Sequence, residues 1–519
     1  LKSETMKNRL IFGLALALFA LIQTPGENAS TTALRFEITV AQALISSPQN
    51  GRLFVMMSRG GQPEPRLTET DTGIDAAPRL GCDVNNFAPG VVGIIDEKAV
   101  AFPVEDLAHL PAGDYFVQAV FDSNIDLKSI NSPGNLYSET RKVRLDPAWP
   151  ETVKIELTQK IPPEQMPPET EYVKYVKIQS DLLSKFHGRP IYLRAGVILP
   201  KDYDKDPARR YPLRVSIGGY GSRFTAAGRM MSAGSEFRKA WLADETPRMV
   251  LLRLDGDGPY GDCYQVNSDN SGPYGDALTQ ELIPYVEQKF RGIGQPYARV
   301  LEGGSTGGWV SLALQVFYPD FFNGTWSGFP DGVDFRAFQL INIYADDNAY
   351  LNARGFERPS ERDLKGDVNF TIRHECQMEN VLGAGDSWTM SGQQWGAWNA
   401  TYGARGADGR PVALWDPKTG KINRGAAEHW KKYDLRLVME RDWKTLGPKL
   451  RGKITIWVGE ADNYFLNNAV HMLEDFLSKA DPAYGGKIIY GAGKGHGWMA
   501  LSERQMMGEM AAAIEKARR

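Results

Sequence analysis

The sequence has little cysteine, little histidine and almost no net charge. Its three cysteines, Cys82, Cys263 and Cys376, are too few and too widely spaced for a disulfide framework or a zinc site. No H-x-x-x-H pattern occurs among the six histidines, so we expect no catalytic metal. The formal net charge of -3 provides no broad field for nucleic acid or an anionic membrane, and a neutral or mixed partner is expected.

Long apolar runs are also scarce, and one short run lies near the N-terminus. Met6 is followed by Lys7 and Arg9, by the apolar residues 10–22, and by Pro25 with small residues after it. This pattern is typical of a secretory signal, because the run is too short to span a bilayer core of roughly 30 Å. We favour it over a membrane anchor. Residues 1–29 are therefore predicted to be a signal peptide with an upstream extension, and the protein to be secreted or periplasmic.

The length of 519 residues favours two domains rather than one. Between residues 30 and 160, short runs of alternating polarity such as residues 113–122 are separated by Gly, Pro, Asn and Asp. Runs of this kind predict an all-β sandwich. The proline-rich residues 161–171 are stiff and polar, as linkers often are. We therefore predict an N-terminal β-sandwich domain over 30–160, a linker, and a second domain over 172–519.

The second domain has a different pattern, in which β-rich runs that end in glycine alternate with helical periodicity. This alternation predicts an α/β domain whose mostly parallel sheet has helices on both faces. An antiparallel pair is expected to open the sheet. The expected strands lie in residues 171–180, 189–200, 211–221, 248–258, 298–305, 453–462 and 486–498, and the expected helices in 275–290, 307–319 and 499–518.

Residues 331–450 interrupt the alternation and contain Trp388, Trp395, Trp398, Trp415 and Trp430 among many Gly, Asp and Asn. An insertion at this point would lie over the carboxyl ends of the strands, where ligands bind in open α/β folds. We therefore predict a lid or substrate platform. Trp388, Trp395 and Trp398 are the predicted substrate contacts, since aromatic rings stack on sugar or aryl groups. The alternative is that these tryptophans belong to an ordinary core.

A serine lies among glycines in the stretch "LEGGSTGGW", residues 301–309, between an expected strand and an expected helix. Gly303-Gly304-Ser305-Thr306-Gly307 fits the pattern G-x-S-x-G. On a tight strand-to-helix turn the neighbours of the serine must be small, and the serine hydroxyl then stands clear of the sheet. The pattern alone is common by chance, but its setting predicts Ser305 as a nucleophile.

A serine hydroxyl is a poor nucleophile at neutral pH and needs a histidine base oriented by a carboxylate. Asp462 and His496 follow the two late strands, in the order Ser, acid, His. The other five histidines lack this order and setting, so His496 is the predicted base. Glu460 competes with Asp462 for the role of the acid, and we favour Asp462 because of its place three residues after Gly459.

Acyl transfer also requires hydrogen-bond donors for the oxyanion. The backbone N–H of Thr306, directly after the serine, is one predicted donor. The second is expected from the glycine-rich loop after the early strand, at Tyr220, with Gly219 as the alternative.

With these motifs assembled, residues 172–519 resemble the α/β-hydrolase superfamily, in the branch that holds esterase D-like and feruloyl esterase-like proteins. The resemblance rests on "IGGYG", "GPYGDALTQELIPYVEQKF", "LEGGSTGGW", "GEADNYF" and "GKGHGW", in this order. It implies ester hydrolysis through an acyl-enzyme, with Ser305 as nucleophile, His496 as base and acid, Asp462 as its orienting group, and no cofactor. In the family's oxyanion loop a histidine often precedes the glycine, whereas this sequence has Ile217 before Gly218.

We therefore predict a secreted serine esterase that cleaves carboxylic esters, with acyl or aryl esters on carbohydrate or plant-derived material as the first candidates. A small-molecule or glycan-linked ester is the expected partner, and the sequence predicts no oligomeric state. Two alternatives stay open. One is a serine peptidase of the prolyl-oligopeptidase kind, and the other is a non-catalytic glycan-binding protein on a hydrolase scaffold.

Overall fold

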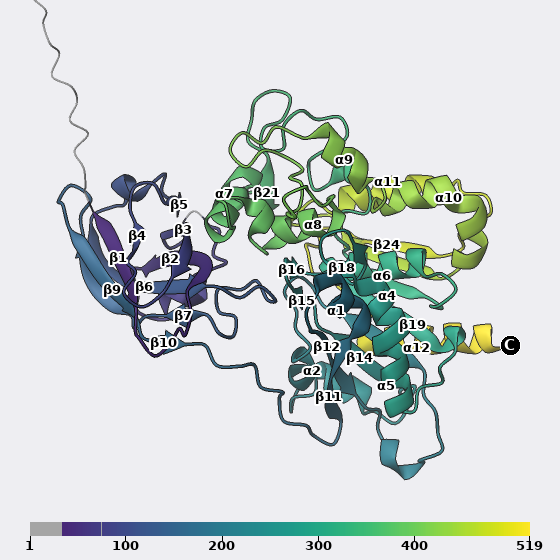
Figure 1. Cartoon of the computed structure of the whole chain (residues 1–519). Coiled ribbons are helices and arrows are strands. Elements are labelled where there is room, and N and C mark those ends of the chain that lie inside the picture. The colour runs from purple at the N-terminus through teal and green to yellow at the C-terminus, as the bar shows by residue number, and fades with distance from the viewer. Residues whose placement is uncertain (1–33, 74) are drawn as a thin grey trace, which may run out of the picture.

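The computed structural model describes residues 34–73 and 75–519 (Figure 1). The predicted signal segment, residues 1–29, lies outside the described residues. We use the name N-terminal β-region for residues 34–160, which contain the first ten strands. These are β1 Arg35–Val40, β2 Gln49–Ser58, β3 Arg79–Phe87, β4 Gly93–Ile95, β5 Val100–Phe102, β6 Gly113–Asp122, β7 Leu136–Tyr137, β8 Arg141–Leu145, β9 Thr152–Leu157 and β10 Gln159–Lys160.

The N-terminal β-region contains two sheets with a shared apolar core. One sheet has the order β4-β1-β9, and the other has the order β10-β7-β6-β2-β3-β5, with β8 paired to β6. In β9, exposed Lys154 and Glu156 alternate with buried Val153, Ile155 and Leu157. This period of two lets each strand bury one face and solvate the other. The short alternating runs of the sequence therefore correspond to real strands, and the β-rich character predicted for this region is confirmed.

Residues 172–519 contain a sheet of eight strands in the order β11-β12-β14-β13-β19-β20-β23-β24. The predicted opening pair is confirmed, because β11 and β12 run antiparallel, and all pairs from β14 to β24 are parallel. The bounds are β11 Val173–Ser180, β12 Ile191–Ile198, β13 Leu213–Ile217, β14 Val250–Leu254, β19 Arg299–Gly304, β20 Thr325–Gly328, β23 Ile454–Gly459 and β24 Lys487–Gly491. Short pairs between them are β15 Asp257–Gly258 with β16 Gly261–Asp262, and β17 Asn267–Ser268 with β18 Gly272–Pro273.

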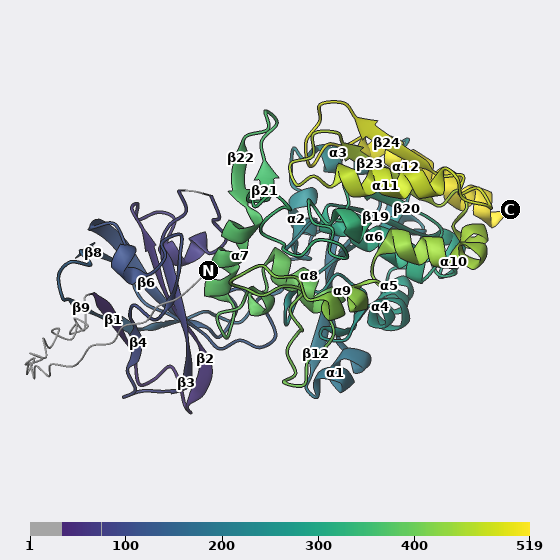
Figure 2. The ribbon, with the colours of Figure 1, turned by 90° about the horizontal axis from the view of Figure 1, so that it is seen from above.

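Helices cover both faces of this sheet, as Figure 2 shows from above. One apolar core joins the sheet to α1 Asp181–His187, α4 Tyr274–Ala277, α5 Ile283–Lys289, α6 Thr306–Phe317, α10 Leu435–Leu450 and α11 Asn467–Leu477. A second core joins the opposite face to α2 Ala226–Met230, α3 Glu236–Trp241 and α12 Glu503–Arg518. The strands bury both faces, which explains their nearly continuous apolar sequences. The α/β class predicted for this part of the chain is confirmed.

Residues 331–450 contain three further α-helices and a hairpin, besides α10. The helices are α7 Ile372–Leu382, α8 Gln394–Tyr402 and α9 Arg424–Trp430, and the hairpin strands are β21 Pro359–Arg362 and β22 Val368–Thr371. Aromatic rings pack edge to face in the interior of this segment, among them Trp395 against Trp398 with centroids 4.8 Å apart. The tryptophans that made the sequence of this segment unusual are therefore its core.

Within residues 34–73 and 75–519, no helix is long and apolar enough to cross a membrane. The same residues contain no group of His, Cys, Asp and Glu side chains arranged to hold a metal ion. Cys82, Cys263 and Cys376 are all unpaired in the structure, and the last two are buried.

Candidate functional site

Ser305 lies on the sharp turn between β19 and α6, with φ 59° and ψ -125°. Residues other than glycine rarely adopt this conformation, and it costs of the order of 1–3 kcal/mol. The surrounding glycines leave no room for larger residues. A Cβ at Gly304 would overlap the Phe329 ring, and one at Gly307 would overlap the carbonyl of Ile217. The turn is therefore held between the sheet and the neighbouring loops, and it directs the Ser305 hydroxyl outward.

His496 lies on the loop after β24 and reaches Ser305 from another strand end. Its Nε2 atom is 3.0 Å from Ser305 Oγ, and its Nδ1 atom is 2.9 Å from Asp462 Oδ2. Asp462 follows β23, which lies next to β24 in the sheet and is separated from β19 by β20. Parallel strands bring their carboxyl ends to one edge, so three residues distant in sequence form one hydrogen-bonded chain. The structure thus brings together all three residues expected to form the triad.

Asp462 is fully buried and held by its own loop. Its Oδ1 accepts hydrogen bonds from the amides of Tyr464 at 2.9 Å and Leu466 at 3.3 Å, which leaves Oδ2 for His496. The His496 ring lies against the rings of Phe329 and Tyr464, with centroids 4.9 and 5.0 Å away. These contacts fix both the orientation of the imidazole and its direction of hydrogen bonding.

Glu460, the alternative acid, lies elsewhere. Its Oε2 is 3.1 Å from His471 Nε2 on α11, and both side chains are exposed. The structure therefore brings Asp462 and not Glu460 to His496.

The residues expected to supply the oxyanion donors lie in the two segments next to Ser305. Thr306 is the first residue of α6, and amides in the first turn of a helix have no acceptor within the helix. The loop after β13 packs against the same turn, because a Cβ at Gly219 would lie 3.6 Å from the Cβ of Ser305. Tyr220 lines the cavity next to Ser305, and its hydroxyl donates a hydrogen bond to the carbonyl of Gly392. A partial positive charge at the start of α6 would also favour an oxyanion here.

A cavity of about 560 Å³ opens over Ser305 and His496. Its walls come from the sheet loops, from residues 331–450 and from a loop of the N-terminal β-region. Four carboxyl groups line it, and none of its described lining residues is a lysine or an arginine. The lining residues are Thr70, Thr72, Tyr220, Gly221, Ser305, Asp331, Gln339, Glu361, Phe370, Glu375, Met378, Glu379, Gln393, Gln394, Trp398, Tyr464, Leu466 and His496.

Asp331 is a member of this cavity that the sequence did not reveal. Its Oδ2 accepts hydrogen bonds from Tyr264 at 2.7 Å and from the side chains of Thr306 and Trp398, both at 3.1 Å. Its backbone amide donates to the carbonyl of Ser305 at 3.3 Å. Burial raises the pKa of Asp331, although the hydrogen bond from Tyr264 opposes this. Asp331 follows the short strand β20, so a sequence prediction of that strand would have identified Asp331 as a candidate site residue.

Two other cavity carboxyls lie on α7. Glu379 accepts hydrogen bonds from the amides of Trp395 and Gly396 and from the Ser391 hydroxyl. Burial and the neighbouring Glu375 raise the pKa of Glu379 to about 8, and burial also raises the pKa of Glu375. Burial therefore favours the neutral form of these acidic groups in the cavity.

The tryptophans expected to contact substrate differ from one another in their positions. Trp398 lines the cavity, and its indole nitrogen donates to Asp331. Trp388 and Trp395 are 0% and 1% exposed and do not line the cavity. Trp388 stacks on Trp415, and Trp395 donates its indole N–H to Glu375 at 2.8 Å. The expectation of a stacking surface at Trp388 and Trp395 is therefore corrected, because both rings pack in the core of the segment.

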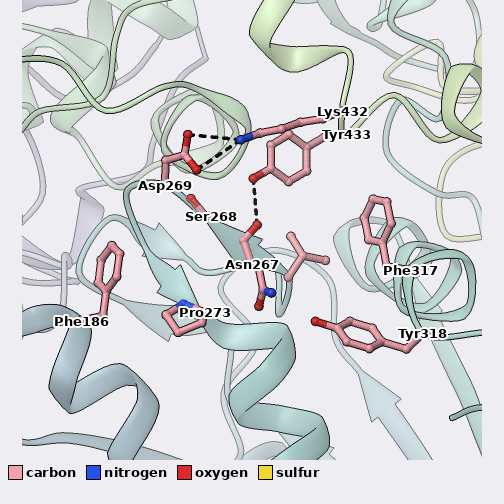
Figure 3. Close-up of a pocket in the computed structure, with 10 residues that line it drawn as sticks. Phe186, Asn267, Ser268, Asp269, Pro273, Phe317, Tyr318, Lys432 and Tyr433 are labelled. Carbon is pink, nitrogen blue, oxygen red and sulfur yellow. Dashed lines mark hydrogen bonds and ion pairs between the residues drawn. The ribbon is translucent and has the colours of Figure 1, made fainter.

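A second cavity, of about 470 Å³, lies between α1, α6 and the end of α9 (Figure 3). Lys432 Nζ is 3.2 Å from both carboxylate oxygens of Asp269, and the Tyr433 hydroxyl donates to the carbonyl of Asn267 at 2.8 Å. Phe186, Pro273 and Phe317 supply apolar walls. Among its described lining residues the charged groups are paired with each other, and the one serine hydroxyl, that of Ser268, donates to the carbonyl of Ala400. The cavity over Ser305 is therefore the candidate active site.

The chain resembles several solved structures at low sequence identity. Solved structures similar to the chain include a fluorophosphonate-binding serine hydrolase of Staphylococcus aureus, with 13% identity and a TM-score of 0.38, covering 66% of this chain and 99% of that one. An S-formylglutathione hydrolase from Agrobacterium tumefaciens has 12% identity and a TM-score of 0.34, covering 67% and 95%. A feruloyl esterase module from Clostridium thermocellum has 11% identity and a TM-score of 0.33, covering 67% and 89%. A search of curated proteins found no match.

The family comparison covers more than half of the chain. Residues 191–479 match the model of the family described as "Putative esterase". This range runs from β12 to just beyond α11 and includes Ser305 and Asp462, whereas His496 lies beyond its end. The chain therefore belongs to this esterase family, and it is a carboxylic ester hydrolase.

Proposed function

We propose that the protein is a serine esterase in which Ser305, His496 and Asp462 form the catalytic triad. The observation that supports this most strongly is the continuous chain from Ser305 Oγ to His496 Nε2 at 3.0 Å and from His496 Nδ1 to Asp462 Oδ2 at 2.9 Å. A hydroxyl paired with an imidazole, which is itself paired with a buried carboxylate, is the arrangement that activates a serine.

In the proposed reaction, His496 removes the proton of Ser305 as Oγ attacks the ester carbonyl carbon. The amides of Thr306 and Tyr220 donate hydrogen bonds to the oxyanion that forms, and Asp462 stabilises the protonated imidazole. His496 then gives its proton to the departing alcohol, which leaves the acyl group on Ser305. A water molecule, deprotonated by His496, attacks this acyl-enzyme; the acid then leaves as the protonated imidazole returns its proton to Ser305 Oγ. Every step uses groups of this chain and water, without a cofactor.

The cavity suggests the class of ester. Trp398 and Tyr464 offer aromatic faces, and Gln339, Gln393 and Gln394 offer amides. Aromatic faces combined with amides and acids suit hydroxylated or aryl groups. We therefore propose acyl or aryl esters, including esters on carbohydrate, as substrates.

We further propose that the chain is organised as the sequence predicts. Residues 1–29 would direct secretion, residues 30–160 would form a sandwich domain, and residues 161–171 would link it to the catalytic domain 172–519. Residues 331–450 would act as a lid or platform. The contribution of Asp331, Phe370 and Trp398 to the cavity wall supports this last role.

The direct test compares the wild-type protein with Ser305→Ala on a chromogenic short-chain ester. The variant is expected to fold normally and to lose at least about 10³-fold in kcat, because no nucleophile remains. A peptide amide substrate is measured beside the ester to test the peptidase alternative. Equal ester hydrolysis by the two proteins would overturn the proposed function.

A further inference from the structure

The N-terminal β-region reaches the cavity over Ser305. Thr70 and Thr72 lie on the loop between β2 and β3, and both line that cavity together with Ser305 and His496. A chain segment more than two hundred residues before the nucleophile thus forms part of the wall around it. The family match, which begins at residue 191, does not include this segment.

A buried arginine fixes the loop that carries these threonines. Arg79, at the start of β3, is 0% exposed, and its guanidinium donates hydrogen bonds to the carbonyls of Glu69 and Asp71. Glu69 and Asp71 lie on either side of Thr70, and Asp71 also directly precedes Thr72. A planar guanidinium with two bonds to alternate carbonyls holds the backbone in one conformation. The two threonine side chains are therefore presented at fixed positions.

The same loop is held from its other side by residues of the β6–β7 connection. The Glu69 carboxylate accepts hydrogen bonds from the Ser129 hydroxyl at 2.7 Å and from the amide of Ile130 at 3.0 Å. Nearby, a Cβ at Gly392 would overlap the side chain of Lys128. The carbonyl of Gly392 also accepts a hydrogen bond from the Tyr220 hydroxyl. The N-terminal β-region therefore contacts the segment beside the proposed oxyanion loop.

Helix α7 joins the N-terminal β-region to the cavity from a second direction, and Figure 2 shows it between the N-terminal strands and α8. Met378, Val381 and Leu382 of α7 pack in an apolar cluster with residues of β2, β5 and β6, namely Phe54, Met56, Phe102 and Val120. Glu375, Met378 and Glu379 of the same helix line the cavity. One face of α7 therefore rests on the N-terminal β-region while the other belongs to the candidate active site.

Close packing at this junction indicates a fixed arrangement. Arg52 of β2 is 3% exposed and donates to the carbonyls of Val381 at 2.7 Å and Asn380 at 3.3 Å, at the C-terminal end of α7. A cation there also interacts favourably with the helix dipole. Gly81 of β3 lies so close that a Cβ would be 2.5 Å from the Val381 carbonyl. A strand with no room for a methyl group is in direct backbone contact with the helix.

From these contacts we propose that the N-terminal β-region is part of the substrate-binding site, with Thr70 and Thr72 in contact with ester groups that extend beyond the scissile bond. The proposal rests on Ser305 being the nucleophile, as proposed above. Small esters fit without reaching this wall, whereas esters with bulky groups on both sides of the carbonyl contact it. The N-terminal β-region thus helps to determine which esters are accepted.

The test introduces a large side chain into the cavity wall at either position, in the variants Thr70→Trp and Thr72→Trp. For each protein, kcat/KM is measured with vinyl acetate, a small ester, and with 2-naphthyl phenylacetate, which has an aromatic group on each side. Glu156→Trp, on the exposed face of β9, is the matched control because it adds the same ring to the same region but on the other sheet, away from the β2–β3 loop. Thermal unfolding confirms that each variant folds.

We expect the ratio of kcat/KM for the large ester to that for the small ester to fall about tenfold in Thr70→Trp or Thr72→Trp. The control is expected to keep the wild-type ratio. A rise of similar size in this ratio would also support the proposal, because it too would show that the new ring contacts the large ester. A ratio within twofold of wild type in both variants would overturn the proposal. If the wild type hydrolyses neither ester, or Ser305→Ala hydrolyses both, the proposed function fails as well, and this is evident before the variants are compared.

Discussion

At the scale of single residues, the site depends on small neighbours as much as on reactive side chains. Ser305 has a positive φ, and the turn around it is tightly enclosed. At Gly307 a methyl group would overlap the carbonyls of Ile217 and Gly218, which belong to the end of β13 and its following loop. The backbone of the turn is therefore in direct contact with the loop proposed to supply an oxyanion donor.

Gly307→Ala is expected to lower the free energy of unfolding by about 1–3 kcal/mol, because the added methyl group cannot be accommodated without moving backbone. Gly508→Ala is the matched control, since Gly508 lies inside α12 with open space around its Cα. That change is expected to stabilise the protein by about 0.5–1 kcal/mol through helix propensity. Denaturant unfolding of both variants provides the measurement, and equal stability of Gly307→Ala and wild type would contradict the described packing.

Asp462→Asn is expected to lower kcat by about 10³–10⁴-fold with little change in stability. The asparagine can still accept from the amides of Tyr464 and Leu466, but its NH₂ group faces His496 Nδ1 and favours the wrong tautomer. Glu460→Gln serves as the control and should leave kcat within twofold, because Glu460 pairs with His471. Steady-state kinetics on a chromogenic ester measure both. A loss below fivefold in Asp462→Asn would remove Asp462 from the triad.

Asp331→Asn tests the buried carboxyl beside the nucleophile. Burial raises the pKa of Asp331 in the folded protein above its unfolded value, so its stabilising contribution is present at low pH and is lost as pH rises through the folded pKa. Asparagine keeps an acceptor for Tyr264, Thr306 and Trp398 but does not titrate. The melting temperature of the variant minus that of wild type should therefore increase from about pH 4 to about pH 8. A difference that stays constant or decreases would show that Asp331 is not held in this way.

At the scale of helices and strands, the sequence predicted the elements with strong patterns and missed the weak ones. The residues of β6 and β23 alternate or run apolar for several positions, and both strands lie where the pattern predicts. Strand β20 has only the four residues "TWSG", and no pattern of period two can be recognised over that length. Because β20 was missed, Asp331 at its end was missed too. The helix expected in residues 275–290 contains a π-helical turn over Leu278–Leu282, which side-chain periodicity does not reveal.

The junction of α7 with the N-terminal strands also has no signal in the sequence. Its contacts join residues about 330 positions apart, as in the hydrogen bond from Arg52 to Val381. Such pairs depend on how the elements pack, whereas periodicity reports only which face of an element is buried. The same limit explains the tryptophans of residues 331–450. They show no single helical period because several short elements contribute them to a common core: Trp388 lies in a short 3₁₀ turn, Trp395 and Trp398 in α8, Trp415 in a loop and Trp430 in α9.

Arg52→Ala is expected to lower the free energy of unfolding by about 2 kcal/mol. It removes charge-assisted hydrogen bonds to the end of α7 and leaves the carbonyls of Val381 and Asn380 without this donor. The matched control is Arg141→Ala, an exposed arginine that also donates to a backbone carbonyl, that of Lys154. It should change stability by less than about 0.5 kcal/mol. Similar unfolding curves for the two variants would mean that Arg52 does not hold the junction.

At the scale of the whole molecule, the chain combines an α/β sheet with a β-rich region that contributes to the same cavity. The order of motifs along the sequence placed Ser305, Asp462 and His496 at three strand ends, because parallel strands present their carboxyl ends at one edge. That reasoning needs no knowledge of packing, and so the proximity of these three residues could be predicted. Thr70, Thr72, Glu375 and Glu379 could not, since they reach the cavity through contacts between regions distant in sequence.

The most direct test of the account is the site at which a fluorophosphonate attaches. The protein and its Ser305→Ala and His496→Ala variants are incubated with the reagent, and the modified peptide is identified by mass spectrometry. We predict one adduct on Ser305 in the wild type, none in Ser305→Ala, and much slower labelling in His496→Ala because the hydroxyl then lacks its base. An adduct on another residue, or ester hydrolysis without any adduct on Ser305, would contradict the account.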